Sequence, residues 1–104
     1  GFHRVRTCAL ARASENQVFV VHAPLVGSLV PWGIEESAVG SAAILAPCDP
    51  SFPANGIVAE GPWSQGAVVV ADVDFELLRK VRLEGAVRTY RDFMNPRSFT
   101  VKAH

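Results

Sequence analysis

This sequence lacks several of the features that identify a protein class at once. Its 104 residues include only two cysteines, Cys8 and Cys48, which stand forty positions apart. No Cys-x-x-Cys pair and no metal-like spacing of histidines accompanies them, which argues against a disulfide scaffold and against a zinc site. This usage fits a reducing compartment, so we expect a cytoplasmic protein that holds no metal and no other cofactor.

Long apolar runs are absent as well. The longest apolar stretches are only as long as a strand, and none has the pattern of a signal peptide or a membrane span. We therefore expect no membrane partner for this part of the protein, although a signal or an anchor could precede residue 1. Because the first residue is glycine and not methionine, we expect a fragment or a processed product.

The chain is also poor in charge. Only 19% of its residues are charged and 49% are hydrophobic, whereas a typical soluble domain has about 25% charged residues. A short chain has a high ratio of surface to volume and should be more polar than average. The composition thus predicts a surface made for a missing partner; the alternative is a compact, rather apolar domain that stands alone.

Basic residues are missing from the middle of the chain. Residues 13–78 contain eight acids and no Lys or Arg, while residues 79–104 carry seven bases against two acids. The basic ends could contact a nucleic-acid backbone, but no aromatic-interleaved motif or known binding module supports that use. We expect them to pair with the acidic middle or with a neighbouring subunit.

The hydrophobic pattern predicts an α/β (α+β) chain with about four strands and two helices. A helix is expected over about residues 4–16, with its apolar stripe on Phe2, Val5, Cys8, Ala9 and Ala13. Residues 18–21 are continuously apolar and β-branched, as in a strand covered on both faces. Further strands are expected at residues 41–46, 57–60 and 67–71, the last two joined as a hairpin by residues 61–66.

Loop and helix signals complete this outline. Residues 24–39 contain Gly27, Pro31, Trp32 and Gly33 and are expected to form a long loop. Asp74 can cap a helix that runs through about Glu84 and ends at Gly85, with a Glu76–Lys80 pair on its surface. Residues 86–104 are expected to form an irregular basic tail.

The junction between the first helix and the first strand is the most informative segment. It reads Arg12-Ala13-Ser14-Glu15-Asn16-Gln17-Val18-Phe19-Val20-Val21. Polar residues between two apolar elements are buried only when each is hydrogen-bonded or paired, so Glu15, Asn16 and Gln17 predict a fixed polar brace, with Arg12 able to pair with Glu15. The segment resembles the Arg-Ala-x-Glu-Asn-Gln-x-Phe-Val signature of the carbon–nitrogen hydrolase (nitrilase) superfamily.

Three other stretches support this resemblance, which runs from residue 1 to about Arg91. Residues 1–6 look like the helix start that precedes the signature, residues 40–44 with Pro47 look like a Gly-x-Ser-x-Ile strand, and residues 69–74 look like the closing strand before a helix. Residues 47–57 are similar to a bacterial branch of the family, some of whose members are fused to an acetyltransferase-like domain. Ala42 stands where the family usually has Ser, and the ending at residues 92–97 also departs from the pattern.

The resemblance implies that residues 1–104 are the C-terminal part of such a hydrolase domain, half of a four-layer αββα sandwich. The family cleaves an amide or nitrile of a small molecule with a Glu base, a Lys and a Cys nucleophile. All three precede the signature in family order, so no catalytic residue is assigned to this chain. The implied partners are the missing N-terminal half, the small-molecule substrate and a second copy, because the family commonly forms dimers.

Both cysteines have a chemical and a structural interpretation. Residues 48–54 imitate the family's nucleophile motif, Cys-x-Asp-x-x-Phe-Pro-Glu, but the Cys-to-Phe spacing is one residue short, Ala54 replaces Glu, and the order along the chain is wrong. We therefore interpret Cys48 as a turn residue. Cys8 has Arg4 and Arg12 one helical turn to either side, yet a small apolar helix residue explains it better than a reactive thiol.

Other residues with chemical potential also have simpler explanations. His22, Trp32 and Ala42 are candidates for the rim of a pocket, although His22 is more simply a hydrogen-bonded residue at a strand edge. Glu15 is more simply a paired carboxylate than an acid or base. Glu35 and Glu36 are expected to be solvated, Trp63 to pack in a core or interface, and Asp72 and Asp74 to start a helix.

The leading hypothesis is thus the C-terminal portion of an amidase- or nitrilase-type hydrolase, inactive and poorly soluble by itself. Two alternatives stay open. One is a free-standing binding or assembly module with the same half-fold and no catalysis. The other is a small nucleic-acid-binding domain that uses its basic ends.

Overall fold

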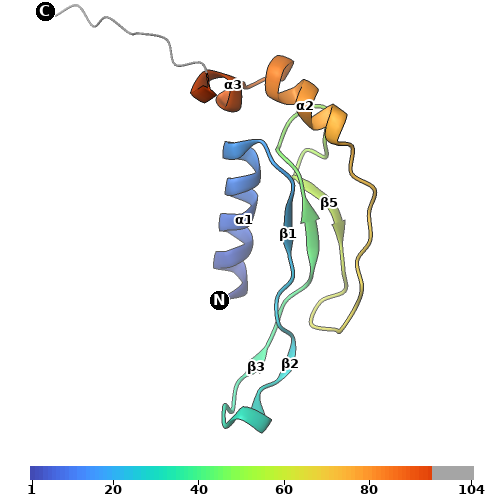
Figure 1. The fold of residues 1–104 in the computed structure, drawn as a ribbon. Helices are drawn as coiled ribbons and strands as arrows, with labels where there is room; N and C mark the ends of the chain where they lie inside the picture. The colour runs from blue at the N-terminus through green and yellow to red at the C-terminus, as the bar shows by residue number, and fades with distance from the viewer. Residues whose placement is uncertain (95–104) are drawn as a thin grey trace, which may run out of the picture.

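The computed structural model describes residues 1–94, which form an α+β chain, as predicted. Their elements, in chain order, are α1 (Phe2–Asn16), β1 (Val20–His22), β2 (Gly27–Ser28), the 3₁₀ turn η1 (Val30–Trp32), β3 (Ser37–Ala38), β4 (Ala43–Leu45), β5 (Ile57–Glu60), α2 (Phe75–Glu84) and α3 (Thr89–Met94). Helix α1 lies along one face of the main sheet, while α2 and α3 lie across one end of it (Figure 1).

The main sheet has three short strands in the order β1-β4-β5, and both pairs are antiparallel. In the register, Ala43 of β4 lies between His22 of β1 and Glu60 of β5. Strands β2 and β3 form a separate two-stranded ribbon that projects beyond the sheet (Figure 1). Residues 24–39 were predicted to be a loop; this is wrong in part, because the ribbon and η1 lie within them.

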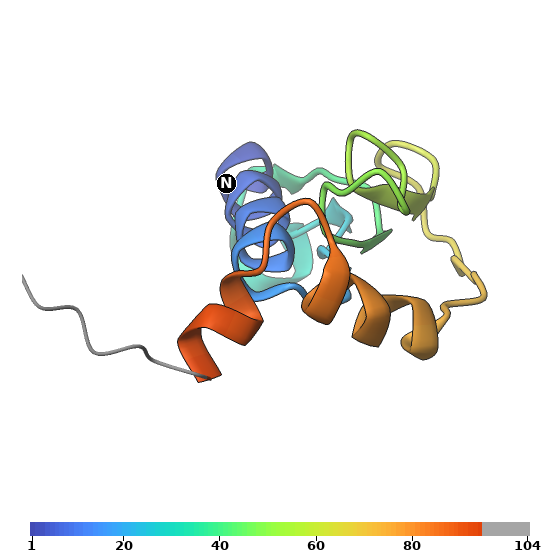
Figure 2. The same ribbon diagram turned by 90° about the horizontal axis from the view of Figure 1, so that it is seen from above.

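Helix α1 packs on the sheet through small side chains. Ala13, Ala43 and Leu45 are buried together, and Ala9, Leu10, Val20 and Ile57 pack around them. Small residues at a contact let a helix approach a sheet closely, and Figure 2 shows α1 beside the strands. The predicted stripe on α1 is confirmed for Ala13, which is buried, but it is wrong for Val5 and Cys8, which are exposed; Arg6, which was not predicted, is the other buried residue of the helix.

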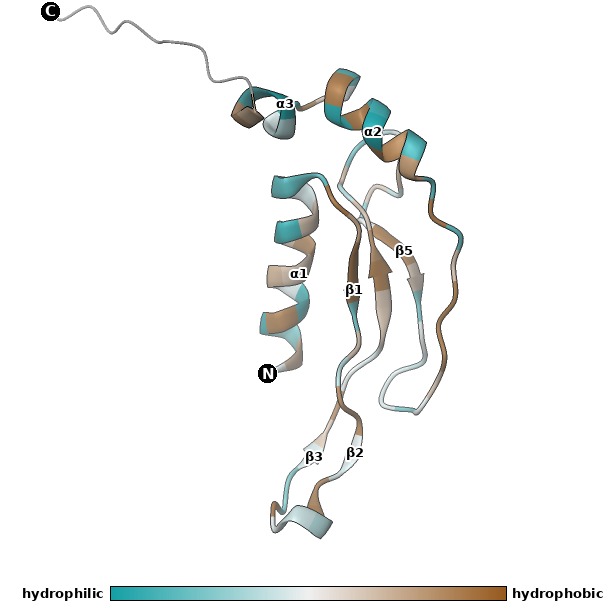
Figure 3. Cartoon of the chain, in the orientation of Figure 1, coloured by the Kyte–Doolittle hydropathy of each residue, from teal (hydrophilic) through white to brown (hydrophobic). Residues whose placement is uncertain are grey.

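The opposite face of the sheet is uncovered by the described residues. Val21 of β1 is 74% exposed, and Phe75 at the start of α2 is 69% exposed. Figure 3 shows hydrophobic residues along β1, β4 and the segment after β5. Because full burial of one such side chain contributes about 1.5–3 kcal/mol, this face could contribute much to a further packing interaction.

Residues 67–71 were predicted to be a strand paired with β5, and this prediction is wrong. They run extended beside β5 but make no strand pairing within the described part of the chain (Figure 1). The reason lies in the connection, which does not turn as a hairpin. The backbone N–H groups of Gly61 and Ser64 donate to the carbonyls of Ala42 and Gly40, at 2.8 and 2.5 Å, which draws the chain across the end of β4.

The ends of the helices follow the sequence signals closely. Asp74 Oδ1 accepts a hydrogen bond from the Leu77 N–H at 3.0 Å, and Gly85 ends α2, both as predicted. Glu76 pairs with Arg79 at 3.7 Å, not with Lys80 as predicted. The expected irregular tail is confirmed for residues 86–88 but wrong for Thr89–Met94, which form α3, and residues 95–104 lie outside the described residues.

Candidate functional site

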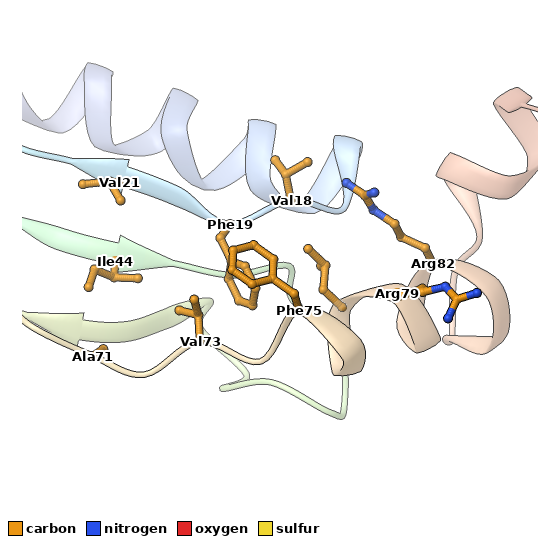
Figure 4. A pocket seen from close by; sticks show the side chains of 10 residues that line it. Val18, Phe19, Val21, Ile44, Ala71, Val73, Phe75, Arg79 and Arg82 are labelled. Atoms are coloured by element: carbon orange, nitrogen blue, oxygen red, sulfur yellow. The ribbon is translucent and has the colours of Figure 1, made fainter.

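A groove of about 670 Å³ lies on the uncovered face of the sheet (Figure 4). It is lined by residues of three segments: Val18, Phe19, Val21 and Ile44 from the sheet region, Ala71 and Val73 from the extended segment, and Phe75, Leu78, Arg79 and Arg82 from α2. The Phe19 ring meets the rings of Phe52 and Phe75 edge-on, each at 5.6 Å between centroids.

The groove has the chemistry of a packing surface. Among the described residues that line it there is no Cys, His or carboxylate. Its two arginines lie at the α2 end, and Arg82 is already bound: Nε donates to the Gln17 carbonyl at 2.8 Å, and the guanidinium lies 4.3 Å from the centre of the Tyr90 ring. Apolar walls without a nucleophile or base suit contact with another protein layer better than a reaction.

A buried polar cluster lies on the other face, centred on Arg6. Arg6 is only 8% exposed, and all parts of its guanidinium have partners. Nε donates to His22 Nδ1 at 2.9 Å, Nη1 to Glu60 Oε2 at 2.5 Å, and Nη2 to the Ser41 carbonyl at 2.5 Å. These contacts tie α1 to β1, β5 and the start of β4. They also offset the cost of burying the Arg6 charge, since a buried charge is tolerated only when it is paired and hydrogen-bonded.

The cluster fixes the protonation state of His22. Because Nδ1 accepts a hydrogen bond from Arg6, the imidazole is neutral and carries its proton on Nε2. Burial, and then the positive charge of Arg6, lowers the pKa of His22 below its usual value of 6.5. The Phe2 ring stacks on the imidazole at 5.4 Å between centroids and lies 4.9 Å from the Arg6 guanidinium carbon, so the ring is also held in place sterically.

Gln17 forms a second buried polar centre at the end of α1. It is 1% exposed and adopts the left-handed conformation, with φ of 51°. Its side-chain amide donates to the Val87 carbonyl at 3.1 Å and accepts from the Tyr90 N–H at 3.0 Å. Gln17 thus connects α1 to the α2–α3 junction.

Apart from Ala13, the other residues of the Arg12–Gln17 signature are not buried. Glu15 and Asn16 are exposed, so burial within the signature is limited to Ala13 and Gln17. The Arg12–Glu15 pair predicted from the spacing is present, at 3.0 Å between Nη2 and Oε2. Asn16 Nδ2 donates to the Arg12 carbonyl at 3.1 Å, which adds a local bond to the last turn of α1.

Both cysteines are exposed free thiols. The Cys48 N–H donates to Ser14 Oγ at 3.1 Å, and Cys48 lies in the turns between β4 and β5, which do not form a strand-to-helix elbow. Its neighbour Asp49 is buried and accepts from the Ser51 and Ala86 N–H groups at 3.1 and 3.2 Å. Asp49 therefore anchors the turn to the end of α2, a role that the sequence pattern did not indicate.

The structure does not bring the three candidate rim residues together. His22 lines a cavity between α1 and the ribbon, whereas Ala42 lines a different one beside the residues after β5. Trp32 lies in η1 at the tip of the ribbon and is 73% exposed. Sequence reasoning missed Arg6, Ser41 and Glu60; the helical spacing of Arg6 with Ala13 and Gln17 was the available signal.

Comparison with known proteins gives one clear relative. Over 92 residues the chain is 40% identical to a protein of Bacillus subtilis (strain 168) named "Probable hydrolase YhcX". The matched part is 88% of this chain and 18% of that relative, so the chain spans less than a fifth of the relative's length. No family model matches the chain, and no solved structure matches it significantly.

None of the helices within residues 1–94 has both the length and the apolar character that crossing a bilayer requires. The same part of the chain contains no group of three or more His, Cys, Asp or Glu side chains placed to bind a metal ion.

Proposed function

We propose that this chain is the C-terminal part of a carbon–nitrogen hydrolase domain of the nitrilase type. The main support is one combination: a chain similar over most of its length to a small share of a probable hydrolase, with one sheet face packed and the other bare. An apolar sheet face of this kind normally packs against another layer of the same domain. In this proposal the missing N-terminal half supplies that layer.

In the complete domain this chain acts as the scaffold. The upstream half supplies the Glu, Lys and Cys that the resemblance implies. With an amide, the Cys thiolate attacks the carbonyl carbon, the amine or ammonia departs with a proton, and water hydrolyses the resulting thioester to the acid. With a nitrile, the thiolate and a proton add to give a thioimidate, one water then replaces its nitrogen as ammonia to form the thioester, and a second water hydrolyses it. Neither Cys8 nor Cys48 takes part, because neither has a base or an orienting group bonded to it among the described residues.

A second copy of the protein is the further partner that we propose. The exposed side chains of α3, Phe93 at 82% and Met94 at 57%, provide an apolar surface on a helix. Pairing through helices is what the family resemblance implies, and burial of such side chains is the usual driving force for association.

The test uses the full-length gene product that contains these residues. We expect it to release ammonia or amine from at least one member of a panel of small amides and nitriles. Replacing the upstream Cys by Ala should abolish release, while Cys48→Ala and Cys8→Ala should leave it unchanged. A folded full-length protein that hydrolyses none of the panel, or one inactivated by Cys48→Ala, would contradict the proposal.

A further inference from the structure

A cavity of about 490 Å³ is lined by residues from the start of α1, the end of β1 and the β2–β3 ribbon. Its walls are mostly apolar and include Phe2, Val5, Leu25 and Val39. His22 and Glu36 are the titratable side chains that line it. A concave, largely apolar space of this size with a few polar groups is typical of a small-molecule site.

His22 presents a fixed donor to this cavity. His22 is only 8% exposed, and its Nδ1 is occupied by the hydrogen bond from Arg6. The proton therefore sits on Nε2, and within residues 1–94 no group accepts a hydrogen bond from that nitrogen. Glu60 holds Arg6 in place, so the donor keeps one orientation and one tautomer.

The charges at the cavity disfavour an anion. Arg6 lies behind His22, but the carboxylate of Glu60 pairs with it and offsets its charge. Glu36 is exposed on the ribbon side of the cavity, and no Lys or Arg is among the described residues that line it. Gly1 also lines the cavity, and in the full-length protein proposed above its nitrogen is an uncharged amide. A ligand in this cavity therefore meets one donor and one negative charge.

We propose that this cavity binds a small ligand that combines an uncharged hydrogen-bond acceptor, taken by His22, with an ammonium group, taken by Glu36. Ligand binding in this cavity is one claim, and its extension to substrate choice rests on the proposed function. If both hold, the parent hydrolase prefers aminoalkyl amides to acidic amides. His22 and Glu36 are specificity-determining contacts and take no part in bond breaking.

Three matched sulfones test this directly, because a sulfone accepts hydrogen bonds but cannot be hydrolysed by a C–N hydrolase. Binding of methylsulfonylpropylamine, methyl propyl sulfone and methylsulfonylpropanoate to the full-length protein is measured by ligand-observed NMR titration. The cationic probe should bind about two- to fivefold tighter than the neutral one, as an exposed ion pair allows, and the anionic probe should bind most weakly.

Two variants locate the contacts. Glu36→Gln should abolish the preference for the cationic probe, while Glu35→Gln, which changes the neighbouring carboxylate outside the cavity, should keep it. His22→Phe should weaken all three probes equally. Equal binding of the three probes, or an unchanged preference in Glu36→Gln, would overturn the proposal. Hydrolysis of amides, measured separately, tests the proposed function independently of these results.

Discussion

The two faces of the three-stranded sheet are built from alternate residues of the same strands, yet they reach opposite states. Val20 and His22 of β1 face α1, and His22 is buried, whereas Val21 between them is 74% exposed. In β4, Ala43 and Leu45 are buried and Ile44 lies in the open groove. The helix completes one face, whereas the other face, which is lined mainly by apolar side chains, has no cover within the described residues.

This difference separates the contacts that the described residues make among themselves from the contacts that the proposed second layer would add. The α1 face combines an apolar core with the Arg6 cluster and is satisfied by local polypeptide. The groove face is mainly apolar, with Arg79 and Arg82 at its α2 end, so its contribution to stability depends on what covers it. Substitutions on the two faces should therefore respond differently to the presence of the rest of the protein.

The largest effect is expected from Arg6→Met on the covered face. This change leaves the buried Ser41 carbonyl and His22 Nδ1 without their partner, at about 1–3 kcal/mol for each unsatisfied group, and it also removes the ion pair with Glu60, whose side chain is 43% exposed. Urea unfolding of the full-length protein measures the loss. Arg4→Met is the matched control on the exposed side of α1, and it should change the free energy of unfolding by less than about 0.5 kcal/mol.

On the groove face, Val21→Asp should destabilise the full-length protein by more than about 2 kcal/mol, because a second layer would bury the new carboxylate without a partner. The control is Thr7→Asp, at an exposed position of α1, with an effect of less than about 0.5 kcal/mol. Equal effects of the two substitutions in thermal or urea unfolding would show that the groove stays open to solvent.

A smaller loss is expected for Gln17→Leu at the end of α1. The Val87 carbonyl and the Tyr90 N–H lose their partner, and an unsatisfied buried group costs about 1–3 kcal/mol. Hydrogen exchange should show lost protection in α3 and at the end of α2 but not in β4. Asn16→Leu serves as the exposed control, and a comparable loss of protection there would contradict a specific role for Gln17.

The smallest effect concerns pH. The pKa of His22 is lowered in the folded state, so the neutral form contributes stability that is present above the unfolded pKa of about 6.5 and lost as the pH falls through the folded pKa. Within that window the free energy of unfolding should fall by up to about 1.4 kcal/mol per pH unit. His22→Gln should remove this part of the pH dependence; an unchanged slope would contradict it.

Much of the local structure could be predicted from the sequence. The Asp74 cap, the Gly85 stop, the strand at residues 57–60 and the Arg12–Glu15 pair all depend on neighbours within a few residues. The prediction of a strand at residues 67–71 is wrong because strand pairing there depends on contacts that are distant in the sequence. Its pairing depends on where the Gly61–Ser64 backbone goes, and hydrogen bonds to residues 40 and 42 decide that.

The sequence by itself determined the class of the chain, the positions of its first two helices and the excess of apolar residues that called for a partner surface. Only the tertiary structure decided that Arg6 is buried, that Gln17 alone of the Glu-Asn-Gln run forms the internal brace, and which face of the sheet stays bare. Composition and short-range spacing indicate how much apolar surface the chain must bury. Which side chain meets which depends on contacts between residues 16 to 73 positions apart, and no local pattern carries that information.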